Sequence, residues 1–168
     1  MDAAKLAHAA APPLAAAFVL GLIGLGGMAA GVPWLFPSLG PTVAIQAGTP
    51  TLPSARPWNV FAGHLIGLAC GIAAVHLTGA VDLASVTEAH ALSGPRLAAA
   101  VLAVLLSMGL QAAARARHPP AEATTLLFAL GALQPDLRSS LTVAGGVVLV
   151  TVLGEACRRM AARQGNEG

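Results

Sequence analysis

Apolar residues form four long runs along this chain, and prolines and polar residues gather in the segments between them. The runs cover residues 12–32, 58–78, 96–114 and 140–157. An apolar helix of about 20 residues crosses the roughly 30 Å hydrocarbon core of a bilayer. Because each run reaches about that length, the pattern predicts an all-α, polytopic membrane helix bundle.

Two shorter apolar segments, residues 40–48 and 121–133, lie between the long runs, and prolines precede both. Each is below the usual length of a spanning helix. Proline is favoured in the first turn of a helix, where its missing N–H group costs no hydrogen bond. The sequence therefore predicts two short helices that begin near these prolines. The alternative is that the prolines only shape turns between the long helices.

Composition supports the bilayer as the environment of the chain. Of its 168 residues, 56% are hydrophobic and 10% are charged, and the mean hydropathy is +0.75, whereas soluble domains carry about a quarter charged residues. We therefore treat residues 1–168 as a single multi-pass domain of the cell membrane, which in a bacterium is the inner membrane. The net charge of +2 includes no long basic run, which argues against nucleic acid as a partner.

The chain lacks the residue patterns of common catalytic and metal sites. Cys70 and Cys157 stand alone in apolar segments, so neither a disulfide framework nor a metal site is predicted. No HExxH pattern, phosphate-binding loop or defensible Ser-His-Asp arrangement is present. We therefore expect no cofactor and no enzyme activity.

The two halves of the chain match each other at an offset of 82 residues without a gap. The matched pairs include Pro13 and Pro95, Gly27 and Gly109, Pro37 and Pro119, Thr42 and Thr124, Arg56 and Arg138, and Gly63 and Gly145. These matches indicate an internal duplication, with repeats at residues 1–82 and 83–164. Each repeat holds a long helix, a short segment and a second long helix.

The distribution of Lys and Arg distinguishes two topologies. If the short segments re-enter without crossing, the four spanning helices leave five basic residues on one side and four on the other. If the segments cross, Arg96 and Arg138 lie on one side, and the other side holds Lys5, Arg56, Arg115, Arg117, Arg158, Arg159 and Arg163. The positive-inside rule favours this second topology, with six segments, inverted repeats and both termini in the cytoplasm. Four helices with two re-entrant segments remain the alternative.

Hydroxyl, imidazole and other polar side chains gather around the two short segments. A helix N-terminus exposes unpaired N–H groups and carries a partial positive charge. Two such ends inside the membrane would bind a small anion without a fully charged side chain. The candidate binding residues are Ser38, Gly40, Thr42, Asn59, His64, His118, Glu122, Thr124 and Thr125.

Several of these side chains also have structural interpretations. His64 lies within a predicted spanning helix, where it either serves the substrate or donates a hydrogen bond to a backbone carbonyl. Asn59 is placed to cap that helix. His118 either lines an entrance or locks the turn before the prolines, and Glu122 either faces the anion or is solvated near the surface.

Glycines recur every four residues in the second long run, at Gly63, Gly67 and Gly71. They form one face of a helix, and small residues on such a face let two membrane helices approach closely. The pattern predicts close packing, either within the chain or in a homo-oligomer.

The segment His118-Pro119-Pro120, followed by Ala-Glu-Ala-Thr-Thr, resembles the signature that gives the HPP family of membrane proteins its name. The stretch from Arg56 to His64 is similar to a second family element, and Leu39-Gly40-Pro41-Thr42 stands where the family has Gly-Ala-Ser. The resemblance covers residues 12–157. It implies a multi-helix membrane domain, and members in chloroplasts and cyanobacteria are described as nitrite transporters.

Two residues depart from the family pattern. Glu122 follows the double proline where the family usually has small residues, and Pro41 replaces a small residue in the first element. A carboxylate is stabilised near a helix N-terminus but would repel an anion there, unless it is protonated or takes up a proton with the anion. The resulting hypothesis is a transporter or channel for a small inorganic anion, with nitrite as the candidate. A non-transporting membrane anchor or sensor module is the alternative.

Overall fold

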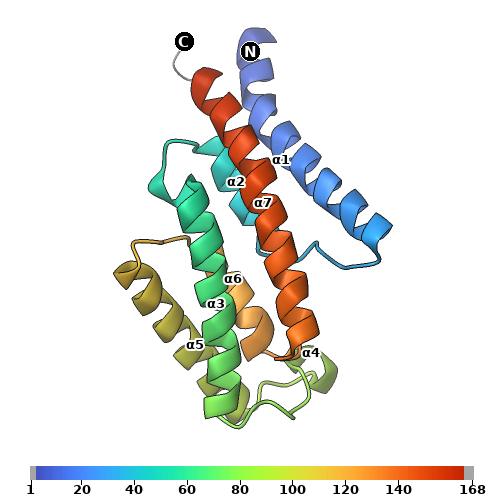
Figure 1. The fold of residues 1–168 in the computed structure, drawn as a ribbon, viewed down its shortest axis with the longest axis vertical. Coiled ribbons are helices and arrows are strands. Elements are labelled where there is room, and N and C mark those ends of the chain that lie inside the picture. The colour runs from blue at the N-terminus through green and yellow to red at the C-terminus, as the bar shows by residue number, and fades with distance from the viewer. Residues whose placement is uncertain (1–2, 165–168) are drawn as a thin grey trace.

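The chain folds into helices in the computed structural model, which describes residues 3–164. The elements in chain order are α1 (Ala3–Ala30), α2 (Leu39–Gly48), the 3-10 helix η1 (Pro53–Ala55), α3 (Pro57–Leu77), α4 (Val86–Ala89), α5 (Gly94–Ala113), α6 (Ala121–Ala129) and α7 (Leu137–Gln164). No strand occurs within residues 3–164 (Figure 1). The predicted all-α bundle is therefore confirmed.

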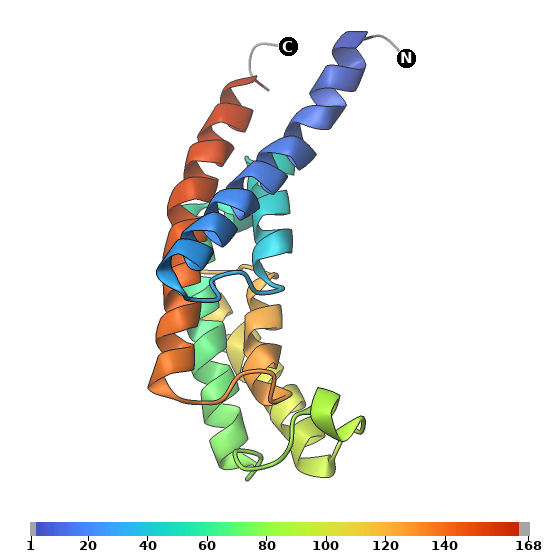
Figure 2. The same cartoon turned by 90° about the vertical axis from the view of Figure 1, so that its right-hand side faces the viewer.

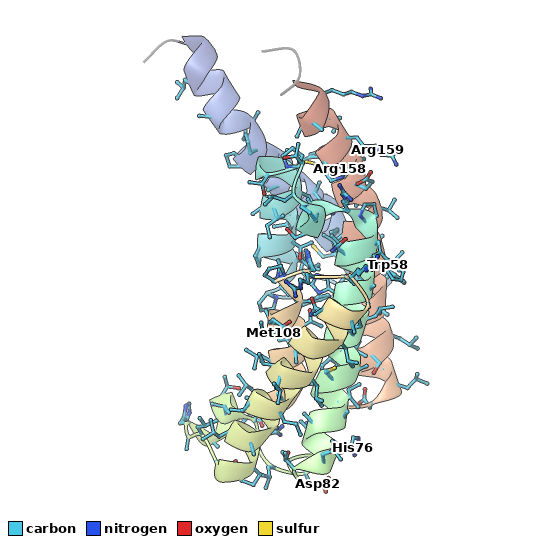
Figure 3. The ribbon with its side chains drawn as sticks, turned by 90° about the vertical axis from the view of Figure 1, so that its left-hand side faces the viewer. Trp58, His76, Asp82, Met108, Arg158 and Arg159 are labelled. Carbon is cyan, nitrogen blue, oxygen red and sulfur yellow. The ribbon has the colours of Figure 1, made fainter. Side chains whose placement is uncertain are left out.

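Four of these helices, α1, α3, α5 and α7, are long and apolar enough to cross a membrane. They contain the four apolar runs of the sequence. Their outer faces carry large apolar side chains that nothing in the chain covers, such as Phe18 on α1, Val101 on α5 and Val152 on α7. Exposed apolar surface of this extent is expected where a protein faces lipid rather than water. Arg158 and Arg159 lie toward one end of the bundle, and His76 and Asp82 lie at the other (Figure 3).

Four helix ends differ by three residues or more from the sequence prediction, among them the end of α7, which lies at Gln164 rather than residue 157. The first helix begins at Ala3 rather than residue 12 and keeps Pro12 and Pro13 inside it, a feature that membrane helices tolerate. α6 ends at Ala129 rather than residue 133, because Gly131 takes a left-handed backbone conformation with φ of 80°.

The last helix begins at Leu137, three residues earlier than predicted. Asp136 explains this start, because its Oδ1 accepts a hydrogen bond from the backbone N–H of Ser139 at 2.7 Å, as an N-cap residue does. The same bond holds the pKa of the Asp136 carboxyl below its usual value. The short helix α4 was not predicted, and its N-cap residue Ser85 forms a capping box with Glu88.

The long helices do not alternate simply in direction. α1 and α3 run the same way along the molecule, while α5 and α7 run the opposite way (Figure 1). The short helix α2 points back toward the end where α1 begins, and α6 points toward the other end (Figure 2). As a result, α1 begins and α7 ends at the same end of the molecule.

Each short helix packs between two long ones. α2 packs against α1 and α7, and α6 packs against α3 and α5. Buried apolar side chains join the first group, among them Ile23 of α1, Val43 of α2 and Val150 of α7. α3 and α7 contact each other and connect the two groups. This packing places both short helices at the centre of the molecule.

Candidate functional site

The N-termini of the two short helices meet in the middle of the molecule (Figure 2). Ser38 is the N-cap residue of α2, and Thr124 lies in the first turn of α6. Their hydroxyl oxygens are 2.7 Å apart and share a hydrogen bond. Prolines stand at both starts, because Pro37 precedes Ser38 and Pro120 is the N-cap residue of α6. The predicted short helices are therefore present, and their starts face each other.

Two imidazoles join these hydroxyls. The ring of His64, from α3, lies with Nε2 3.0 Å from Oγ1 of Thr42 and Nδ1 2.8 Å from Oγ1 of Thr124. The ring of His118 lies with Nε2 3.0 Å from the same Thr42 oxygen and Nδ1 2.8 Å from the carbonyl oxygen of Ser54. The two ring centroids are 4.9 Å apart.

We call these five side chains the hydroxyl–imidazole cluster: Ser38, Thr42, His64, His118 and Thr124. Each of them is 0% exposed. Buried polar groups require hydrogen-bond partners, and these side chains find theirs in one another and in two carbonyl oxygens. The cluster offers hydroxyls, imidazoles and helix N-termini, which are groups that bind small anions. Because all five side chains are fully buried, the cluster is closed to solvent in this structure.

Glu122 lies in the first turn of α6, but its carboxylate is directed toward α5. Its Oε1 accepts hydrogen bonds from Nε2 of Gln111 at 2.7 Å and from the hydroxyl of Ser107 at 3.1 Å. Oε1 of Gln111 in turn accepts the backbone N–H of His118 at 2.9 Å. Glu122 therefore acts on the cluster through Gln111, which fixes the backbone of His118.

Three other residues expected in the site lie outside the cluster. The hydroxyl of Thr125 donates to the carbonyl oxygen of Ala121 at 3.1 Å and reaches Ser107 at 3.3 Å. Asn59 donates to the carbonyl oxygen of Arg117 at 3.0 Å and so ties the start of α3 to the loop before α6. Gly40 lies in the first turn of α2 with open space at its Cβ position. The side chains of Thr125 and Asn59 form their hydrogen bonds with groups outside the five cluster side chains.

Sequence reasoning did not identify Ser107 and Gln111. Both are buried on α5, and they are four residues apart, so they share one face of an otherwise apolar helix. Polar residues on one face of a membrane helix are expected to point into the protein. That spacing was the signal that could have found them.

The predicted glycine face of α3 holds α6 close to it. A Cβ atom at Gly67 would lie 2.6 Å from Oγ1 of Thr125, and one at Gly71 would lie 2.6 Å from the carbonyl oxygen of Thr125. At Gly63 it would lie 2.7 Å from Cβ of His118. The close packing predicted for these glycines therefore occurs within the chain, while a homo-oligomer stays a prediction.

Arginines lie at the outer ends of both short helices. The guanidinium of Arg96 donates to the carbonyl oxygens of Phe128 and Ala129 at the end of α6, at 3.4 and 3.3 Å. Arg158 donates to the carbonyl oxygen of Pro50, just beyond α2, at 3.1 Å. Positive charge is favourable at a helix C-terminus. Both short helices thus have their N-termini inside and a cation near the outer end.

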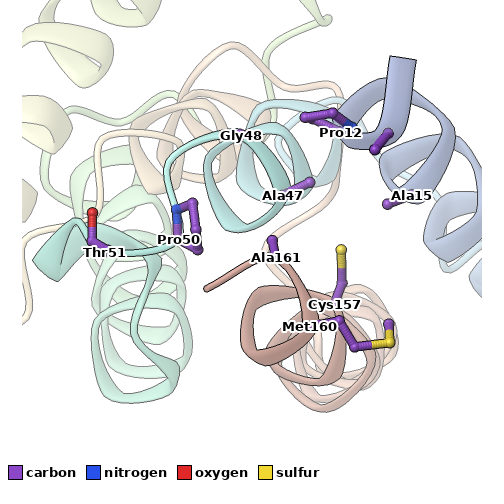
Figure 4. Close-up of a pocket in the computed structure, with 10 residues that line it drawn as sticks. Pro12, Ala15, Ala47, Gly48, Pro50, Thr51, Cys157, Met160 and Ala161 are labelled. Carbon is purple, nitrogen blue, oxygen red and sulfur yellow. The ribbon is translucent and has the colours of Figure 1, made fainter. Parts of the chain in front are cut away.

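An apolar cavity of about 450 Å³ lies apart from the cluster, between α1, the end of α2 and α7 (Figure 4). Its lining includes Pro12, Ala47, Cys157 and Met160 and holds no charged side chain. Thr51 supplies the one hydroxyl of this lining. Among the side chains that the structure describes, those of residue 6 and residues 9–163, no group of three His, Cys, Asp or Glu is placed to hold a metal ion.

The comparison with known families agrees with this architecture. The family model described as HPP, transmembrane region, matches residues 1–166. The chain therefore belongs to the HPP family of membrane proteins. No curated protein and no solved structure matches it.

Proposed function

We propose that this HPP-family membrane protein is a transporter or channel for a small inorganic anion, with nitrite as the first candidate. The observation that carries this proposal is the meeting of the α2 and α6 N-termini, where Ser38 and Thr124 share a hydrogen bond of 2.7 Å. The partial positive charges of both helices are directed at this one buried place. Glu122, the acidic residue of α6, is directed toward α5 instead, so it does not block an anion.

The directions of the helices support six membrane segments arranged as two inverted repeats. Because α1 and α3 run the same way, the chain between them must turn back, and α2 runs in that opposite direction (Figure 1). Four helices with re-entrant segments would require α1 and α3 to run oppositely. In the inferred topology both termini lie in the cytoplasm, and the protein resides in the cell membrane.

The fully buried cluster supports alternating access rather than a permanently open pore. A carrier of this kind moves one group of helices against the other around a central site. α1, α2 and α7 form one such group and α3, α5 and α6 form the other, and the contact between α3 and α7 joins them. We therefore favour a carrier among the two possibilities.

The test is anion flux into liposomes that contain the purified full chain. Nitrite should enter faster than into empty liposomes, and either Thr42→Val or Thr124→Val should reduce the rate. Thr151→Val is the matched control, because the Thr151 hydroxyl bonds only to the carbonyl oxygen of Val147 in its own helix. No flux of nitrite, nitrate, chloride or formate above empty liposomes would overturn the proposal and favour the anchor or sensor alternative.

A further inference from the structure

The hydroxyl–imidazole cluster contains six hydrogen-bond contacts, but five hydrogens are available when both imidazoles are neutral. Each of the three hydroxyls supplies one hydrogen, and each neutral imidazole supplies one. The contacts are those described above, together with the bond from the Thr42 hydroxyl to the carbonyl oxygen of Ser38 at 2.8 Å. One contact therefore lacks a hydrogen.

The missing hydrogen belongs between His118 and Thr42. The carbonyl oxygen of Ser54 can only accept, so Nδ1 of His118 carries the ring hydrogen and Nε2 presents a lone pair. The single hydrogen of the Thr42 hydroxyl goes either to this lone pair or to the carbonyl oxygen of Ser38. In the first case the Ser38 carbonyl keeps only the longer bond from the Thr42 backbone N–H, at 3.3 Å.

One added proton gives each of the six contacts its own hydrogen. With a hydrogen on Nε2, His118 donates to Thr42, which also accepts from Nε2 of His64 and donates to the carbonyl oxygen of Ser38. This arrangement uses both lone pairs and the hydrogen of the Thr42 hydroxyl. A second proton on His64 would place two positive rings 4.9 Å apart, where they repel. The hydrogen-bond geometry of the cluster therefore accommodates one additional proton and disfavours a second.

Charge decides when this proton binds. A buried imidazolium is costly without a partner, and the two helix N-termini oppose it further. A bound anion at the same place reverses both effects, and the imidazolium in turn favours the anion. We propose that the cluster takes up one proton on Nε2 of His118 together with each anion, so that the proton is the coupling ion. This proposal rests on the anion transport proposed above.

In the part of the chain that the structure describes, the titratable side chains on the helices around the cluster form no direct hydrogen bond to Nε2 of His118. Within the described residues, α2 carries no titratable side chain. Glu122 of α6 hydrogen-bonds through Oε1 to Gln111 and Ser107, and only Gln111 links it to His118. On α7, Glu155 pairs with Arg158 and Arg159. The other titratable side chains on or beside these elements are Arg56, Arg115 and Arg117, which are exposed, and the buried Cys70, six residues beyond His64 on α3. The exposed His76 lies at the far end of α3 (Figure 3). Arg96 lies at the opposite end of α5 from Gln111.

The direct test counts protons taken up when nitrite binds to the purified full chain in weak buffer with a pH indicator. We expect about one proton per bound nitrite, and nitrite affinity that falls about tenfold per pH unit once the cluster is deprotonated. Sodium gluconate at equal ionic strength corrects for salt effects. His118→Gln should abolish the uptake, while His76→Gln, at an exposed histidine, should leave it unchanged.

Nitrite binding without proton uptake by the unmodified chain would overturn proton coupling and leave anion transport standing. In liposomes, that outcome would appear as flux driven by an imposed potential and indifferent to a pH gradient. Coupled transport predicts the reverse dependence, after subtraction of the leak of nitrous acid through empty liposomes. Absence of both binding and flux would overturn the two proposals together. The measurement on the unmodified chain decides even where His118→Gln fails to fold.

Discussion

Thr42 and Thr124 hydrogen-bond to opposite nitrogens of the same imidazole ring, that of His64, at 3.0 and 2.8 Å. The two threonines come from short helices that point away from each other, and they match at the offset of 82 residues (Figure 2). Each half of the chain therefore contributes an equivalent hydroxyl to one shared partner.

The histidines break this equivalence. At the same offset, Phe36 matches His118 and Gly146 matches His64. A Cβ atom at Gly146 would lie 2.6 Å from Cε1 of Phe36, so the positions matched to His64 and His118 are also close to each other. Each half of the chain therefore supplies one of the two imidazoles, and the matching position in the other half carries glycine or phenylalanine.

Replacing Thr124 by valine should both slow anion flux and lower stability. The Thr124 hydroxyl bonds to Ser38 and to Nδ1 of His64, and the isosteric methyl group would leave these buried atoms without a partner. We expect a loss of about 1–3 kcal/mol in the free energy of unfolding, together with reduced nitrite uptake. Thermal unfolding in detergent and flux in liposomes measure the two effects. Unchanged flux in a folded Thr124→Val protein would remove the cluster from the transport path.

Glu122 should be dispensable as a charge but required as a hydrogen-bond acceptor. Glu122→Gln keeps an oxygen for Gln111 and Ser107, so we expect a cost of about 1 kcal/mol and continued anion flux. Glu122→Ala leaves Gln111 without its acceptor and should loosen its hold on the His118 backbone. Comparing the flux of the two variants separates the effect of the carboxylate charge from the effect of the hydrogen bond that positions Gln111. Equal loss in both would show that the negative charge itself is needed.

Gly67 should not tolerate a methyl group. A Cβ atom there would lie 2.6 Å from Oγ1 of Thr125 and 2.8 Å from the carbonyl oxygen of Ala121, so α6 would have to move. We expect Gly67→Ala to cost about 1–3 kcal/mol of stability. Gly109→Ala is the matched control, because its Cβ position is open and alanine favours a helix interior. A Gly67→Ala protein as stable as the control in thermal unfolding would contradict this packing.

The Arg96 guanidinium should stabilise the outer end of α6. Its guanidinium is 2% exposed and donates to the carbonyl oxygens of Phe128 and Ala129. Arg96→Met keeps much of the side-chain length but removes the donor to the carbonyl oxygens of Ala129 and Leu83, at 3.3 and 2.6 Å, while the Phe128 carbonyl keeps the backbone N–H of Gly131. The loss should cost about 1–3 kcal/mol or more. The exposed Arg138 provides the control, and Arg138→Met should change the midpoint of thermal unfolding little. Similar midpoints for both variants would argue against this capping role.

The six-segment topology predicts that Arg56 and Arg138 lie on opposite sides of the membrane. Single cysteines at these exposed positions, in a chain whose two native cysteines are replaced by alanine, should react with an impermeant thiol reagent from opposite sides. The measurement compares how much each cysteine is labelled in intact cells and in membranes that have been opened. Reaction of both positions from one side would instead support four helices with re-entrant segments.

The sequence alone determined the membrane character, the four long helices and the existence of the two short ones. These features follow from local properties, namely the length of apolar runs and the effect of proline on the first turn of a helix. Some helix ends differed from the prediction because of local backbone geometry. The left-handed conformation of Gly131 ends α6, and Asp136 caps the start of α7.

The tertiary structure alone decided which polar residues meet. Sequence reasoning treated Glu122 and His118 as equal candidates, yet Glu122 turns toward Gln111 while His118 enters the cluster with Thr42. The choice depends on the direction in which α6 leaves the centre and on how closely it lies against Gly67. Such contacts join residues far apart along the chain, so spacing within one helix could not reveal them.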